Sequence, residues 1–145
     1  MRRGLGGMEI YQRFAARIAA HRERLLDLLR SLKREGKKVV GYGASTKGNV
    51  LIQYCGLGPD LVPCIAEVNP DKFGAYTPGS RIPIVSEADA RALKPDYFIV
   101  FPWHFREGIL RREQEFLRGG GRLIFPLPSL DILSARGREM LWAAP

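Results

Sequence analysis

Residues 37–49 read Lys-Lys-Val-Val-Gly-Tyr-Gly-Ala-Ser-Thr-Lys-Gly-Asn, and this segment is the strongest indication of the fold. It begins as a short apolar strand, passes through Gly41 and Gly43, and is expected to open a helix at about Lys47. Such a turn leaves free backbone N–H groups at the start of the helix. Together with the helix dipole, these groups favour an anion, typically a phosphate. The two glycines let the backbone turn tightly and approach a ligand. The stretch therefore predicts an anion-binding turn, to which Lys47 adds a positive charge.

The glycine pattern matches no nucleotide fingerprint completely. Gly41-x-Gly43 begins a dinucleotide fingerprint, but Thr46 stands where the third glycine belongs. The Gly43-x-x-x-x-Gly48 spacing is similar to a P-loop, yet Asn49 stands where that loop needs lysine, so an NTPase is rejected. A tight strand-to-helix turn that binds nothing stays an open alternative.

Size and composition indicate one ordered domain. The 145 residues are 46% apolar, which is enough for a core. The formal charge is +8, but the basic residues are spread along predicted helices, so solvated faces are favoured over nucleic acid binding. Cys55 and Cys64 lack metal-ligand spacing, which predicts neither zinc nor a disulfide framework and fits a reduced, cytoplasmic setting. No apolar run is long enough for a membrane span.

A long helix is expected over residues 8–36, after a flexible tail at 1–7. Apolar residues and one histidine recur every three or four positions, which predicts a stripe along one face. Its members are Tyr11, Phe14, Ile18, His21, Leu25, Leu28 and Leu32. The second half is expected to pack on a sheet while the first half reaches past it. A short coiled coil, and with it a homodimer, is the alternative. His21 is interpreted as a half-buried packing residue, and Gly36 as the C-cap.

Strands and helices alternate after Gly36. Strands are expected at 38–42, 61–67, 97–101 and 122–125, with a short extended piece at 82–85, and helices at 47–54, 86–93 and 105–117. This order predicts an α/β fold, a doubly wound, Rossmann-like parallel sheet over 37–130, preceded by the long helix. Residues 131–145 are expected to be a C-terminal extension, and a short helix is expected from Leu130 onward.

Three loops are expected to meet at the carboxyl edge of this sheet, where such folds bind ligands. They hold residues 43–48, 67–69 and 102–105. Glu67 would grip a ribose hydroxyl or be an ordinary loop acid. Trp103 would stack on a base or sugar or cap the core, and His104 would donate a hydrogen bond or be merely exposed. No catalytic set and no metal cluster stands out, which indicates a binding module.

Several segments in order resemble one known family, the C-terminal domain of the SAM-dependent sugar C-methyltransferases. The likeness covers about residues 11–128. It rests on the segments 40–49 (Val-Gly-Tyr-Gly-Ala-Ser-Thr-Lys-Gly-Asn), 54–60 (Tyr-Cys-Gly-Leu-Gly-Pro-Asp), 68–74 (Val-Asn-Pro-Asp-Lys-Phe-Gly), 76–84, 95–97 and 101–104 (Phe-Pro-Trp-His). This likeness is far more specific than the glycine turn alone.

The resemblance implies a division of labour within a larger enzyme. A zinc-binding segment and a SAM-binding domain precede a Rossmann-like C-terminal domain, which helps to hold a nucleotide-linked deoxysugar. The SAM-binding part, in cis or in trans, supplies SAM and the catalytic base. This chain carries neither zinc cysteines nor a SAM domain, so it is expected to bind no cofactor and to be inactive alone. The family's glycine-lysine loop corresponds here to Gly41, Gly43, Ala44, Ser45, Lys47 and Gly48.

The main hypothesis is a nucleotide-sugar-binding domain of a sugar C-methyltransferase. Lys47 and the loop amides would take the diphosphate, Glu67 a hydroxyl, and Trp103 and His104 the sugar or base. The alternative is a CoA- or NAD-binding Rossmann module that acts as a cofactor sensor or enzyme subunit.

Overall fold

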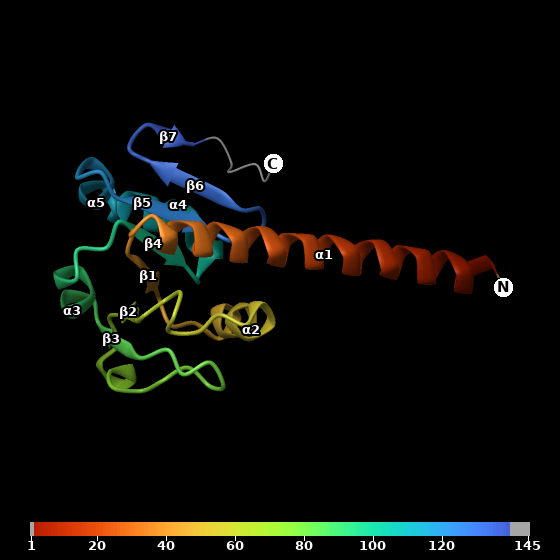
Figure 1. Ribbon diagram of the computed structural model, residues 1–145, viewed down its shortest axis with the longest axis horizontal. Coiled ribbons are helices and arrows are strands. Elements are labelled where there is room, and N and C mark those ends of the chain that lie inside the picture. The colour runs from red at the N-terminus through yellow and green to blue at the C-terminus, as the bar shows by residue number, and fades with distance from the viewer. Residues whose placement is uncertain (1, 140–145) are drawn as a thin grey trace.

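One seven-stranded sheet forms the centre of the molecule (Figure 1). The computed structural model describes residues 2–139, with side chains from residue 7 onward. The strand order is β3-β2-β1-β4-β5-β6-β7, and the first five strands are parallel, whereas β6 and β7 run antiparallel to their neighbours. The strands are β1 (Val39–Tyr42), β2 (Ile65–Glu67), β3 (Ile84–Ser86), β4 (Tyr97–Val100), β5 (Arg122–Phe125), β6 (Asp131–Ser134) and β7 (Gly137–Arg138).

Helices cover both faces of this sheet. Successive side chains of a strand point to opposite faces, so Ile99 and Phe98 of β4 belong to two separate buried clusters. The first cluster includes side chains of α1 (Arg2–Arg34) and α2 (Thr46–Cys55). The second includes side chains of α3 (Glu87–Ala92), α4 (Arg106–Arg112) and α5 (Gln114–Arg118). Two 3₁₀ turns, η1 (Pro70–Lys72) and η2 (Trp103–Phe105), follow β2 and β4.

Helix α1 has two halves with different surroundings. Leu25, Leu28 and Leu29 are buried against the sheet, whereas Tyr11 is 68% and Phe14 54% exposed on the half that projects beyond it (Figure 1). This confirms the expected division of the helix. The helix starts at Arg2, although the Arg- and Gly-rich composition of residues 1–7 predicted a tail there. Gly36 ends the helix in the left-handed conformation, at φ +77°, as predicted.

The C-terminal extension is a β-hairpin and not a helix, so the prediction of an all-parallel sheet is wrong at this end. Ile132 packs into the first buried cluster and Leu133 into the second, which is the alternation of a strand buried on both sides. Ser134 pairs with Gly137, and Gly137, which directly follows the turn residues 135 and 136, has a φ of +103°, a conformation that favours glycine. Residues 140–145 of the predicted extension lie outside the described residues.

The outer edge of β3 is closed by a segment of the same chain. The N–H of Gly74 donates to the carbonyl of Ile84 at 3.0 Å, and the N–H of Ile84 donates to Ala75 at 2.9 Å. Thr77 pairs with Ile82 in the same way, at 2.9 Å. At the opposite edge, β7 is only two residues long.

Candidate functional site

The glycine turn joins β1 to α2 as predicted, and its glycines are required by close packing. Gly43 has a φ of +81°, and α2 begins at Thr46, one residue before the expected start. The Ser45 side chain caps the helix by accepting a hydrogen bond from the Gly48 N–H at 3.0 Å. A Cβ on Gly48 would lie 2.4 Å from the Cβ of Phe101, so the first turn of α2 can approach the end of β4 only without a side chain there.

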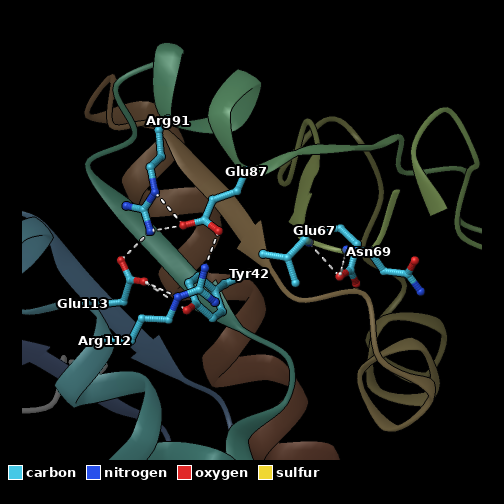
Figure 2. A network of polar contacts seen from close by, with 8 residues as sticks. Tyr42, Glu67, Asn69, Glu87, Arg91, Arg112 and Glu113 are labelled. Carbon is cyan, nitrogen blue, oxygen red and sulfur yellow. Dashed lines mark hydrogen bonds and ion pairs between the residues drawn. The ribbon is translucent and has the colours of Figure 1, made fainter. Parts of the chain in front are cut away.

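The Glu67 carboxylate ties two loops together. Its Oε1 accepts from the Ala44 N–H at 3.1 Å, and its Oε2 accepts from the N–H groups of Val68 at 2.8 Å and Asn69 at 3.0 Å. Figure 2 shows the side chain between the end of β2 and the Asn69 turn. Burial alone would raise the pKa of this carboxyl, but these amides and the charge of Lys72 outweigh it and hold the pKa below its usual value. The Ala44 N–H, which was expected to bind the diphosphate, therefore already donates its hydrogen bond to Glu67.

Lys72 was not predicted as part of this arrangement. Its ammonium donates to the Ala44 carbonyl at 2.7 Å and lies 3.8 Å from Glu67 Oε1. Together with Glu67 it fixes both backbone groups of Ala44. Nothing in the spacing of Lys72, 28 residues after Ala44, points to this contact.

A second polar network surrounds a buried carboxylate at the start of α5. Glu113 is 2% exposed, accepts from the Tyr42 hydroxyl at 3.0 Å and pairs with Arg91 at 2.6 Å. Arg91 also pairs with Glu87 at 2.7 Å, and Arg112 reaches the same Glu87 carboxylate (Figure 2). Burial, followed by the charge of Glu113, raises the pKa of the Tyr42 hydroxyl, which stays protonated. This residue, Glu113, interrupts the single helix predicted over 105–117.

The predicted site residues are distributed over several hollows, and the loops after β1 and β4 meet between Gly43 and Pro102. A Cβ on Gly43 would lie 2.8 Å from Pro102 Cδ, so the loops after β1 and β4 touch. A hollow of about 350 Å³ lies beside the ends of β1 and β2 and helix α4, and it is lined by Gly43, Ala44, Ser45, Glu67 and Arg112 among others. We call it the strand-end hollow. Gly43, Ala44 and Ser45 also line a third hollow of about 310 Å³, together with Lys72. Lys47 and Trp103 face a larger groove.

This larger groove, the α1–α2 groove, has a volume of about 630 Å³ and combines basic with aromatic side chains. Arg17 and Arg24 of α1 line it together with Lys47 of α2, and Phe14, Tyr54 and Trp103 supply aromatic surface. Lys47 and Trp103 were predicted from the sequence to bind the ligand, whereas the two arginines and Tyr54 were not. A signal existed, because Arg17 and Arg24 are seven residues apart and each directly precedes a member of the apolar stripe, so they share one helix face.

Of the remaining predicted residues, His104 and Gly41 lie apart from this groove, whereas His21 lines it. His104 is exposed on η2 and lines none of these hollows, and its ring lies 4.3 Å from that of Phe105 between centroids. Gly41 is buried within β1, where a Cβ would lie 2.7 Å from Ile65 Cγ1, so it serves packing between β1 and β2. His21 is half-buried, as expected, and donates from Nε2 to the Pro126 carbonyl.

Two classes of site are not seen in the part of the chain that the structure describes. Residues 2–139 hold no group of three or more His, Cys, Asp or Glu side chains that would bind a metal ion. None of their helices is long and apolar enough to cross a membrane. Cys55 and Cys64 are buried free thiols, and burial raises the pKa of both.

Comparison with known proteins identifies the class to which this fold and site belong. Residues 1–128 match the family described as the C-methyltransferase C-terminal domain, and the chain belongs to that family. Among characterised proteins it is similar to the C-methyltransferase NovU of Streptomyces niveus, with 38% identity over 132 residues. The match covers 91% of this chain but only 31% of that relative, so the chain spans about a third of its length.

Proposed function

We propose that this domain holds a nucleotide-linked deoxysugar for methylation by a larger enzyme. The observation that carries the proposal is that Lys47 and Trp103, both named from the sequence, face one groove beside the glycine turn. A cation and a flat aromatic surface suit the two chemically distinct parts of a nucleotide, its phosphates and its base. The parallel strands in the order β3-β2-β1-β4-β5, with helices on both faces, support a Rossmann-like, doubly wound interpretation.

The methyl transfer itself would take place outside this chain. The two thirds of the relative that this chain does not match leave room for a SAM-binding domain, which would supply the methyl group and the catalytic base. The projecting half of α1 would dock onto that part, because Met8, Ile10, Tyr11 and Phe14 are large apolar side chains that are more than half exposed. This chain would position the sugar and keep its nucleotide fixed.

Thermal unfolding with a panel of ligands tests the proposal. The panel contains dTDP, UDP, GDP, CoA, NAD and SAM, and a ligand present at 100 times its Kd stabilises the folded chain by about 2.7 kcal/mol. We expect a rise in Tm with a nucleoside diphosphate and none with SAM. Lys47→Ala should reduce that rise, while Lys37→Ala, which removes an equal charge outside the groove, should not. A rise with CoA or NAD alone would instead favour a cofactor-binding module.

A further inference from the structure

We propose that the nucleoside diphosphate part of the ligand binds in the α1–α2 groove and not in the strand-end hollow, where α/β folds of this kind usually bind ligands. The inference rests on the proposed function and assigns the nucleoside diphosphate to the groove that Lys47 lines. It gives Arg17 and Arg24 of the leading helix a direct part in binding.

Charge distinguishes the two hollows. The α1–α2 groove is lined by Arg17, Arg24 and Lys47, and no Asp or Glu is among its lining residues. An anion that enters it therefore meets three positive charges without a competing carboxylate. In a partly enclosed groove such charges act together, because the low-dielectric walls focus their field.

The charged residues that line the strand-end hollow disfavour the binding of an anion there. Its one lining cation is Arg112, whose guanidinium already pairs with Glu87 and lies 3.9 Å from Glu113. Glu67 also lines it, and its depressed pKa keeps the carboxylate charged. A diphosphate there would have to displace Glu87 from Arg112 and tolerate Glu67. The hydrogen bond between Ala44 and Glu67 also removes one loop amide from anion binding.

The apolar surface of the α1–α2 groove suits a nucleobase. Phe14, Tyr54 and Trp103 line it, and its volume of about 630 Å³ lies within the range of small-molecule sites, roughly 300–1,000 Å³. The guanidinium of Arg22 lies 5.8 Å from the centroid of the Tyr54 ring and supports that ring from α1. The hydrogen bond from His21 to Pro126 ties α1 to the loop that supplies Leu127 and Pro128 to the groove.

Calorimetric titration of the chain with dTDP, UDP and GDP tests the assignment. The wild-type chain is titrated first, and a failure to bind any of the three would overturn both this inference and the proposed function. The double variant Arg17→Gln, Arg24→Gln is then compared with Arg13→Gln, Arg30→Gln. Both pairs lie on α1 and are exposed, and each lowers the formal charge from +8 to +6, but only Arg17 and Arg24 line the groove. Arg13 lies 3.9 Å from Glu9 in an exposed ion pair, which contributes little to stability.

We expect the groove variant to bind the nucleotide at least about tenfold more weakly, because each arginine contributes a charge-assisted contact, and the control to change by less than about twofold. If the two variants bind with equal affinity while the wild-type chain binds, nucleotide binding in the α1–α2 groove is contradicted. The proposed function would not be affected by that result. Circular dichroism checks that each variant is folded.

A third variant tests the base-stacking half of the inference. Tyr54→Leu keeps an apolar side chain but removes the aromatic ring. We expect it to weaken nucleoside diphosphate binding about fivefold and to leave the binding of inorganic pyrophosphate, which has no base, unchanged. An equal loss for both probes, or no loss for the nucleotide, would contradict stacking of the base on Tyr54.

Discussion

Replacing Glu67 by glutamine tests whether this carboxylate stabilises the two loops after β1 and β2. In the folded chain, one oxygen accepts from Ala44 and the other from Val68 and Asn69. The side chain is 10% exposed, so water can replace few of these contacts. Glutamine has one carbonyl oxygen, which can serve one side only, and its NH₂ group would then face another donor.

The expected loss follows from this hydrogen-bond count. The broken bond to a charged acceptor costs about 1.5–3 kcal/mol, and the two that remain weaken by about 0.5 kcal/mol each because the acceptor becomes neutral. We therefore expect Glu67→Gln to lower the free energy of unfolding by about 3 kcal/mol, which corresponds to a fall in Tm of about 10 °C for a domain of this size. Urea unfolding at pH 7, followed by circular dichroism, measures it. Glu23→Gln, at an exposed position on α1, is the control.

The pH dependence gives this prediction a second, independent readout. The pKa of Glu67 is lower in the folded chain than its unfolded value of about 4.3, so its contribution is fully present above that value. The contribution is lost as the pH falls from the unfolded value through the folded pKa, and wild type and Glu67→Gln should converge in stability once the pH is below the folded pKa. A loss of less than about 1 kcal/mol in the free energy of unfolding at pH 7 would contradict this role of the Glu67 carboxylate. A difference between the two proteins that persists unchanged in acid would contradict it as well.

Three further predictions concern packing and the buried network. Tyr42→Phe should lower the free energy of unfolding by about 2 kcal/mol, because it removes a buried hydrogen bond to the charged Glu113, whereas Tyr54→Phe, at an exposed ring, serves as the control. Gly48→Ala should cost about 2 kcal/mol in urea unfolding, since its Cβ would overlap the end of β4, and a variant as stable as wild type would disprove that contact. Leu29→Ala should cost about 3 kcal/mol while Phe14→Ala changes stability by less than about 0.5 kcal/mol, and similar losses for both would mean that the projecting half of α1 also packs within the chain.

Local patterns in the sequence were sufficient to predict most of the elements. The stripe that includes Leu25 and Leu28 placed one face of α1 on the sheet, and the apolar run of β4 indicated a strand buried on both sides. Gly43 marked the turn into α2. These predictions succeeded because periodicity and glycine geometry are properties of short segments, read without knowledge of distant contacts.

The errors arose where distant contacts decide the structure. The strand β6 pairs with β5, and the 105–117 segment breaks at Glu113, whose carboxylate contacts Arg91 and Tyr42 from distant parts of the chain. Glu67 accepts from backbone amides, which carry no mark in the sequence. The residues of the candidate site were likewise predicted to form one site, but in the structure they line separate hollows around the contact between two loops.

The strands at both margins of the sheet are short, and this restricts how the domain can assemble. An unpaired strand edge is the surface on which a second chain adds a strand, and it is also where sheets aggregate. Here the 74–77 segment is hydrogen-bonded to Ile84 of β3 and to Ile82 before it, and β7 is two residues long. Within residues 2–139, neither margin offers a long open strand. Association with the rest of a larger protein, or with another copy, would therefore proceed through helix faces and loops, where side-chain identity determines the partner.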